Sequence, residues 1–314
     1  MKKFLRQIII FSSIIILILA IGEIVARLLP TSYGYKHHWM MKNGDKVSTL
    51  VLGSSHTYYG VRPDAFADST FNLANISQTP EYDLALMERY LPLMPNLRRV
   101  IIPVSYFTYR DPVIEKGDEW TLAVRYKIHM DLPLHSDFSI YNFEITDFDA
   151  YKGKLKNLIL KAPSNQCDSL GFGLGYTLSS RSEKWKEMGA ERALKHTLET
   201  PGRFKDVRSI QDSLLSLARK HDIEVVFITT PAHSGYTEAL DADQLAEMYE
   251  GIGELVKGDG VVYFDFLNDS RFSESDFYDP DHLNDEGAEK FTQILYSSLF
   301  GDAPDRRPSL SRKK

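Results

Sequence analysis

The stretch TLVLGSSHTYYG (residues 49–60) runs from an apolar segment straight into Gly53, two serines and His56. The apolar residues before Gly53 are typical of a buried strand. Glycine permits a tight turn, and a serine just past such a turn can place its hydroxyl and its N–H on the same side. The stretch therefore predicts one of two structures: a nucleophile at the end of a strand, or a serine that only begins a helix.

Four further runs of aliphatic and β-branched residues predict strands, namely FNLAN (71–75), RVIIPVSYF (99–107), EVVFITTP (224–231) and VVYFDF (261–266). Helical patterns lie between and after them: PEYDLALMERYLPLM behind a candidate cap at Thr79, SIQDSLLSLARKH from Ser209, DQLAEMYEGIGELV from Asp243, and finally DEGAEKFTQILYSSLF. Strands that alternate with helices predict an α/β fold whose parallel sheet is covered on both faces. In such sheets, functional sites lie at the carboxyl ends of the strands.

The composition excludes several classes of protein. The chain has 314 residues, 43% of them hydrophobic, and a formal net charge of -6. This charge gives no electrostatic basis for binding nucleic acid, so we expect no nucleic-acid partner. A single cysteine, Cys167, can form neither an internal disulfide nor a cysteine-based metal site.

The amino terminus predicts a membrane anchor. Lys2, Lys3 and Arg6 precede an apolar segment over residues 8–29, which is long enough to span a bilayer if Glu23 lies near an interface. Basic residues before the span place the amino terminus in the cytoplasm and the rest of the chain outside, in the periplasm or the extracellular space. A cleaved signal peptide is the alternative, but the segment offers no convincing small-x-small cleavage site.

We expect four parts along the chain: the amino terminus and anchor (1–30), a linker (31–46), a globular domain (47–300) and a polar basic tail (301–314). The stretch 109–205 is too long for an ordinary connection between strands. Amphipathic patterns within it predict a mostly helical insertion, which forms a lid, a partner-docking surface or simple packing. Its GFGLGYTLSS segment (171–180) lacks the spacing of a nucleotide-binding glycine motif and predicts a loop.

The segment DPDH (279–282) lies between the fifth strand and the last helix, so it too is expected at the carboxyl edge of the sheet. Serine needs a base within hydrogen-bonding reach and a third group that orients the base. His282 can be that base for Ser55. Either Asp279 or Asp281 can hold its imidazole in the tautomer that accepts the serine proton.

Gly-x-Ser after the first strand, together with Asp-x-x-His before the last helix, resembles the SGNH/GDSL hydrolase superfamily, with Ser54 where that family usually has Asp. The resemblance covers about residues 47–300, excluding the insertion. It implies a flavodoxin-like α/β/α sandwich with a five-stranded parallel sheet. It also implies Ser55 as nucleophile, His282 as base and Asp279 as orienting acid.

Two other family blocks match less closely. NLANISQT (72–79) is similar to the second block, with Ser77 where the family usually has Gly; its backbone N–H is a candidate oxyanion donor. The third block normally supplies an Asn side chain, which IIPVSYFTY lacks. Asn75, Ser105 and Tyr106 are the candidate substitutes.

The remaining histidines do not predict a metal site. His56 is either structural or a substrate contact, and His233 is a loop residue that follows the fourth strand. His37 and His38 are adjacent and so point in different directions, without a carboxylate cluster beside them. We expect no metal and no cofactor.

The anchored layout resembles extracytoplasmic proteins of alginate and exopolysaccharide O-acetylation, or of teichoic acid D-alanylation. The resemblance implies a membrane-anchored serine esterase or O-acyltransferase that acts on acylated cell-surface or secreted glycans. The alternative is a catalytically inactive accessory protein that binds a glycan or a membrane-bound acyltransferase. The absence of the third-block Asn favours this alternative, whereas Ser55, Asp279 and His282 oppose it.

Overall fold

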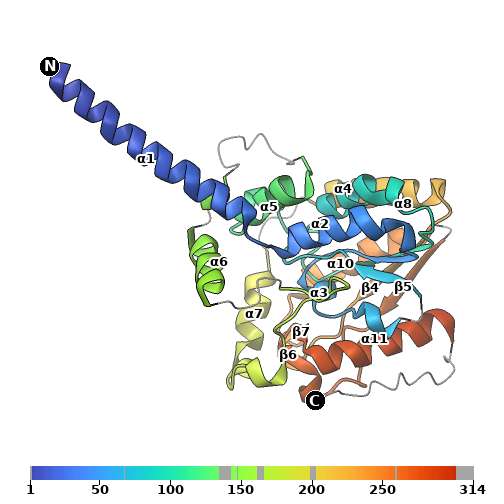
Figure 1. Cartoon of the computed structure of the whole chain (residues 1–314). Helices are drawn as coiled ribbons and strands as arrows, with labels where there is room; N and C mark the ends of the chain where they lie inside the picture. The colour runs from blue at the N-terminus through green and yellow to red at the C-terminus, as the bar shows by residue number, and fades with distance from the viewer. Residues whose placement is uncertain are drawn as a thin grey trace, which may run out of the picture.

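A five-stranded parallel sheet forms the centre of the computed structural model, which describes residues 2–66, 68–133, 143–146, 148–160, 166–198, 203–258 and 260–301. The strand order is β2-β1-β3-β4-β5 (Figure 1), the order of flavodoxin-like doubly wound folds. The strands are β1 (Thr49–Val51), β2 (Thr70–Asn72), β3 (Arg99–Pro103), β4 (Glu224–Thr229) and β5 (Val261–Asp265). The predicted fold class and all five predicted strands are confirmed.

Alternation along the central strands divides the core into two layers. In β1, Leu50 belongs to one hydrophobic cluster and Val51 to the other. In β3, Ile102 and Ile101 are divided in the same way. Successive side chains of a strand point to opposite faces, so continuous apolar runs need cover on both sides.

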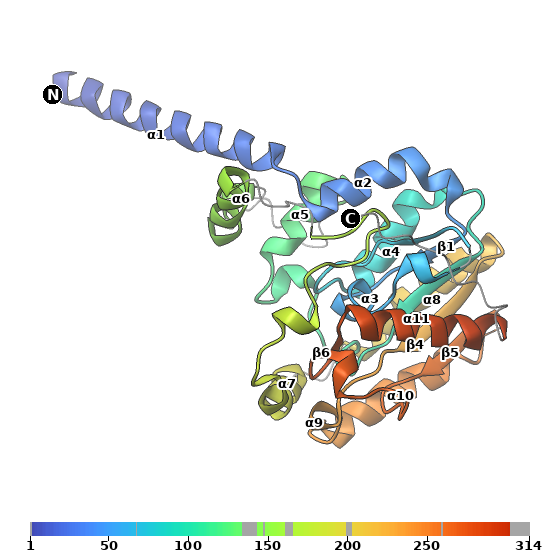
Figure 2. The same cartoon turned by 60° about the horizontal axis from the view of Figure 1, so that its bottom comes forward.

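Helices supply this cover (Figure 2). The first cluster includes residues of α2 (Ser32–Asn43), α4 (Pro80–Tyr90), α5 (Thr121–Met130), α8 (Phe204–Lys220) and α10 (Ala242–Leu255). The second cluster includes residues of α11 (Asp285–Phe300), which pack with the opposite faces of β1, β3 and β4. The short helices are α3 (Ser55–Tyr58) and α9 (Ser234–Thr237), and an antiparallel pair is formed by β6 (Phe277–Asp279) and β7 (His282–Leu283).

Three local predictions need correction. Residues 31–46, expected as a linker, contain α2, because its Tyr33 and Met40 are buried in the core. The helix expected from Ser209 begins at Phe204. Thr79 lies at the N-cap position of α4, but its side chain makes no capping hydrogen bond.

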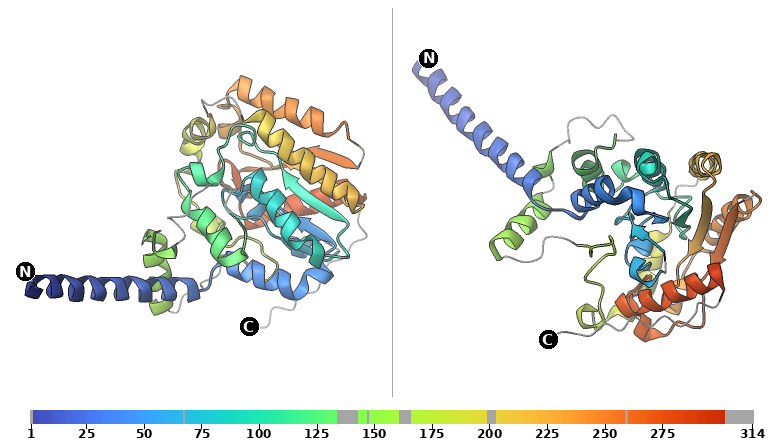
Figure 3. Two further views of the ribbon diagram at one scale, coloured as in Figure 1. Left: turned by 90° about the horizontal axis from the view of Figure 1, so that it is seen from above. Right: turned by 45° about the vertical axis from the view of Figure 1, so that its right-hand side comes forward.

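Helix α1 (Lys2–Leu28) projects away from the globular part (Figure 3). It is long and apolar enough to cross a membrane, and none of its most apolar stretch is buried against the rest of the protein. Near its carboxyl end, the Glu23 carboxylate binds Arg27 at 2.6 Å and accepts hydrogen bonds from the N–H groups of Glu144 and Ile145, both at 3.2 Å. These contacts attach the end of α1 to the insertion.

The insertion carries α5, α6 (Phe148–Leu160) and α7 (Gly189–His196) in its described parts. Short 3-10 helices complete the secondary structure: Gly44–Lys46, Pro63–Ala65, Leu91–Leu93, Ile114–Lys116, Glu144–Thr146, Leu178–Ser180, Trp185–Met188 and Glu274–Asp276. The tail predicted over 301–314 lies outside the described residues, apart from Gly301.

Candidate active site

The turn after β1 requires glycine. Gly53 has a φ of +104°, and a Cβ added there would lie 2.1 Å from the Pro103 side chain. Other residues rarely adopt this conformation, and the approach of Pro103 excludes a side chain outright. The N–H of Gly53 donates to the buried Asp83 carboxylate at 2.8 Å. This turn places Ser55 as the first residue of α3, where its own N–H has no partner within the helix.

Ser55, His282 and Asp279 form a continuous hydrogen-bonded chain. The Ser55 Oγ lies 2.8 Å from His282 Nε2, and His282 Nδ1 lies 2.9 Å from Asp279 Oδ1. Ser55 is partly exposed, whereas the other two side chains are buried. The geometry matches a nucleophile, a base and an orienting acid.

Asp279 rather than Asp281 makes the hydrogen bond to the imidazole. Asp281 Oδ1 lies 3.5 Å from His282 Nδ1, which is beyond a good hydrogen bond. Asp279 Oδ1 also accepts the backbone N–H groups of Asp281 and His282, at 3.1 and 2.9 Å. The other oxygen, Oδ2, accepts Arg192 Nη2 at 2.6 Å. The carboxylate is therefore held firmly in one orientation.

The two carboxylates control the protonation of His282. Burial by itself favours the neutral imidazole, but Asp281 and Asp279 outweigh it and raise the pKa of His282 to about 10. A base that accepts the serine proton must be neutral. Its reactivity should therefore increase as the pH rises toward this pKa.

His56 and Ser105 lie beside this chain, and the other candidates are turned to different partners. His56 Nδ1 lies 2.7 Å from Ser105 Oγ, and its ring centroid lies 5.0 Å from that of His282. Asn75 Nδ2 donates to the Leu73 carbonyl at 3.2 Å and to Gln78 Oε1 at 3.0 Å. The Asn75 side chain is thus occupied within its own loop.

Tyr106 and His233 have structural roles in this conformation. The Tyr106 hydroxyl accepts the N–H of Asp241 at 3.0 Å. His233 caps α9, because its Nδ1 accepts the N–H of Gly235 at 3.1 Å. Neither side chain joins the Ser55 chain.

Ser77 adopts a left-handed backbone conformation, with a φ of 53°. Its hydroxyl binds Glu119, so only its backbone is left as a candidate donor. Glycine adopts this conformation more easily than serine does. The conformation therefore agrees with the resemblance, which aligns Ser77 with a position usually occupied by Gly.

Sequence reasoning missed two features of the site. Arg192 comes from α7 in the insertion, and nothing in the sequence links it to Asp279, which lies 87 residues away. A stack of three tyrosine rings also lies beside the histidine: Tyr176 is 3.7 Å from Tyr59 and 3.9 Å from Tyr278 between ring centroids. The Tyr176 ring meets His282 edge-on at 5.4 Å, so the predicted loop 171–180 contributes to the wall of the site.

One group of described residues has the chemistry of metal ligands. His56, Asp281 and His282 offer ligand atoms that lie within 4.8 Å of one another. Arg192 Nε already lies 3.0 Å from Asp281 Oδ1, and both nitrogens of His282 are occupied by Asp279 and Ser55. A metal ion would meet a guanidinium cation and would displace these contacts. The group fits a metal poorly.

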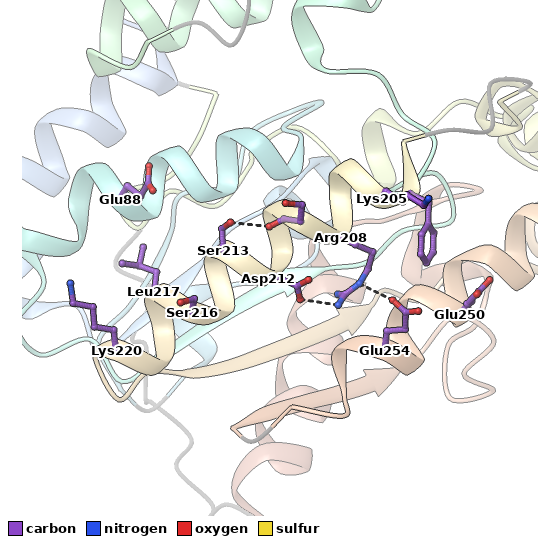
Figure 4. Close-up of a pocket in the computed structure, with 12 residues that line it drawn as sticks. Glu88, Lys205, Arg208, Asp212, Ser213, Ser216, Leu217, Lys220, Glu250 and Glu254 are labelled. Carbon is purple, nitrogen blue, oxygen red and sulfur yellow. Dashed lines mark hydrogen bonds and ion pairs between the residues drawn. The ribbon is translucent and has the colours of Figure 1, made fainter.

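A surface groove of about 980 Å³ lies elsewhere, over α4, α8 and α10 (Figure 4). Its charged side chains are partly paired with one another: Arg208 lies 2.9 Å from Asp212 and 3.2 Å from Glu254. Ser55, Asp279 and His282 do not line it. The groove therefore does not serve as the entrance to the Ser55 site.

No protein-family model and no curated protein sequence matches the chain. A solved structure from Streptococcus pneumonia, provisionally described as a platelet activating factor, is 10% identical over 93% of this chain and 99% of its own, with a TM-score of 0.42. A provisionally described acylhydrolase from Bacteroides fragilis NCTC 9343 is 12% identical over 83% of this chain and 95% of its own, with a TM-score of 0.39. Likenesses at this level carry no functional argument, so the chemistry rests on the geometry of the site.

Proposed function

We propose that the chain is a membrane-anchored serine esterase or O-acyltransferase that acts on acylated cell-surface or secreted glycans. The observation that carries the proposal is the chain from Ser55 Oγ through His282 to Asp279, with contacts of 2.8 and 2.9 Å. The contact between Ser55 and His282 joins residues 227 positions apart in the sequence. If Ser55 and the DPDH segment served only to begin helices, no contact between them would be expected.

In the proposed reaction, Ser55 Oγ attacks the carbonyl carbon of an ester while His282 Nε2 takes its proton. The tetrahedral intermediate then expels the alcohol, which leaves with the proton from His282. An acyl group remains on Ser55. Water or a sugar hydroxyl attacks this acyl-enzyme and gives its proton to His282. The second tetrahedral intermediate then breaks its bond to Ser55 Oγ, which takes the proton back from His282, and an acid or a new ester is released.

The negative oxygen of the tetrahedral intermediate needs hydrogen-bond donors. The N–H groups of Ser55 and Ser77 are the candidates that the backbone offers. The side-chain donors of Asn75 and Tyr106 are already bound, those of Asn75 to Leu73 and Gln78 and that of Tyr106 to Thr197 Oγ1, so neither offers a third donor. Since loss of one donor costs on the order of 10²- to 10³-fold in rate, we expect slow turnover unless the substrate or a partner supplies another.

The anchor in this proposal is α1. Its apolar side chains are not buried against the protein, and a bilayer would surround them with an apolar environment. Glu23 supports this assignment, because its contacts with the insertion place the acidic residue at the protein end of the helix. The basic residues at the amino terminus favour a cytoplasmic start and an extracytoplasmic domain.

Activity-based labelling of the full chain in detergent tests the proposal. We expect a fluorophosphonate to form an adduct on Ser55 in the wild-type protein, located by mass spectrometry of peptides. His282→Ala should remove the adduct, because the serine would then have no base. Ser209→Ala, on the exposed side of α8, is the matched serine control and should label like the wild type.

A folded wild-type protein that is not labelled at Ser55 would contradict the proposal. Adduct formation that persists in folded His282→Ala would contradict the assigned base. With a labelled protein in hand, release of acetate or another acid from acylated sugars distinguishes hydrolysis, while transfer to an added sugar acceptor indicates an acyltransferase.

A non-catalytic accessory role is the second candidate, favoured by the occupied side chains of Asn75 and Tyr106. In that case Ser55→Ala would leave surface acylation unchanged at equal protein abundance. The same variant should abolish the effect of the protein on acylation if the chain is an enzyme.

A further inference from the structure

A second chain of hydroxyl, imidazole and carboxylate lies beside the first. Ser105 Oγ is 2.7 Å from His56 Nδ1, and His56 Nε2 is 3.4 Å from Asp281 Oδ2. The other oxygen of Asp281 is 3.5 Å from His282 Nδ1. Asp281 therefore lies between two imidazoles, one of which is the proposed base.

Asp281 is a buried carboxylate with one guanidinium and three imidazoles around it. It is 2% exposed, with Arg192 Nε at 3.0 Å and His196 Nδ1 at 3.9 Å. Burial would raise its pKa, but His282 and His56 outweigh this effect and hold the pKa well below the usual value. The low pKa keeps the side chain ionised. A buried charge without partners would be costly, and the neighbouring guanidinium and imidazoles offset this cost.

The contacts determine the tautomer of His56. An ionised Asp281 can only accept a hydrogen bond, so His56 Nε2 carries the ring proton and donates it in a hydrogen bond, while Nδ1 accepts a hydrogen bond from the Ser105 hydroxyl. Burial lowers the pKa of His56, so the ring is neutral. His56 consequently orients Asp281 without cancelling its charge.

The charge balance around His282 then favours its protonated form. Asp279 and Asp281 each contribute one negative charge, and Arg192 contributes one positive charge, which leaves one net negative charge beside the imidazole. Burial lowers the pKa of His196 to about 4, so this ring adds no positive charge near neutral pH. The surplus charge would stabilise the imidazolium that forms when Ser55 loses its proton.

We propose that Asp281 is a second carboxylate of the general base, a positioning residue that stabilises the His282 imidazolium while His56 and Ser105 hold it in place. The proposal rests on the proposed function, because it assigns His282 as the base. It goes further, since three residues would suffice for the proposed reaction. Asp281 and the residues that hold it would set the pH range in which the enzyme works.

The titratable and charged groups that face His282 and Asp281 come from several elements. They are Asp279, His56, Tyr59, Tyr176, Arg192, His196 and Tyr236. Of these, only Asp279 and Arg192 carry a charge near neutral pH in the site described above. These two residues are therefore the ones to vary alongside Asp281.

The direct test is an NMR titration of the full chain in detergent with ¹³C-labelled histidine, using His282→Gln to assign the signal. We expect Asp281→Asn to lower the titration midpoint of His282 by about one pH unit or more, as loss of a nearby opposite charge does. Asp276→Asn is the matched control, because Asp276 lies on the same segment but pairs with Lys290. The His282 midpoint in Asp276→Asn should equal that in the wild type. A His282 midpoint in Asp281→Asn that also equals the wild-type value would overturn the proposal.

A second variant covers the case in which Asp281→Asn does not fold. Asp281→Ser removes the same charge with a smaller side chain, so it should also lower the His282 midpoint by about one pH unit or more. A midpoint equal to that of the wild type in folded Asp281→Ser would overturn the proposal.

Fluorophosphonate labelling against pH provides the kinetic readout. Labelling should require neutral His282, so the rising limb of the profile should move to lower pH in Asp281→Asn. A structural role alone would lower the rate at every pH without moving the limb, and that result would overturn the proposal. Absence of labelling in the wild type would instead contradict the proposed function, while the NMR midpoints would still decide the role of Asp281.

Discussion

Two chains of the same three residue types meet at the carboxyl edge of the sheet, but only one has an accessible hydroxyl. In the first chain, Ser55 is partly exposed and its histidine lies 2.9 Å from Asp279. In the second chain, Ser105 is 5% exposed and its histidine lies 3.4 Å from Asp281. Residue types alone therefore do not distinguish the proposed nucleophile from a buried hydroxyl, whereas the exposure of the hydroxyl and the length of the contacts do.

The difference arises from the elements that carry the two serines. Ser55 follows the sharp Gly53 turn and opens α3, which exposes its hydroxyl. The N–H of Ser105 donates to Thr108 Oγ1 at 2.8 Å, so this residue is held inside the turn after β3. Asp281 of the second chain also lies 3.5 Å from His282 Nδ1 of the first, so the second chain can act on the first through the charge of this carboxylate.

The largest expected effect separates the two serines. Ser55→Ala should lower ester hydrolysis on the order of 10⁶-fold, since removal of a triad nucleophile has an effect of this size. Hydrolysis of acylated sugars measures the change, and circular dichroism establishes that the variant is folded. Retention of more than about one tenth of the activity would assign the chemistry to another group.

The next effect separates the two carboxylates. Asp279→Asn should lower turnover on the order of 10⁴-fold, because an amide at this position favours the wrong tautomer of the base. Single-turnover labelling of Ser55 measures the change. A smaller loss in Asp279→Asn than in Asp281→Asn would reverse the roles of the two acids.

Substitution of Arg192 should shift the pH dependence of labelling in the direction opposite to that of Asp281→Asn, and the effect on activity should be smaller than that of Asp279→Asn. Arg192→Gln removes the cation that faces both carboxylates, at 2.6 Å from Asp279 and 3.0 Å from Asp281. Their charge would then stabilise the imidazolium more strongly and raise the pKa of His282. The rising limb of the labelling profile should move to higher pH by about one unit. A shift to lower pH would contradict the charge balance described for the site.

The smallest expected effect is that of Ser105→Ala. Loss of the hydroxyl leaves the buried Nδ1 of His56 without its donor, which should lower the free energy of unfolding by about 1–3 kcal/mol. The rate should fall less than about tenfold, since Asp281 keeps its charge. Chemical denaturation and labelling kinetics measure the two quantities. A loss as large as that of Ser55→Ala would make the second chain the reactive one.

Much of the fold could be predicted because it depends on local pattern. Buried parallel strands need apolar runs, and the five runs of this chain all form strands of the sheet. The local pattern of residues 31–46 did not show that α2 is a helix and not a linker. Its residues Tyr33 and Met40 reveal their role only through the core against which they pack.

The sequence by itself determined the order of the strands and helices, the apolar length of α1 and the three residues of the proposed triad. Gly53 and the DPDH segment carry local signals, since backbone conformation and residue spacing are short-range properties. Tertiary structure alone decided that Asp281 lies between two histidines and that Arg192 from the insertion balances the charge of the carboxylates. Such contacts depend on distances between residues far apart in the chain, and a single sequence does not encode these distances in a readable pattern.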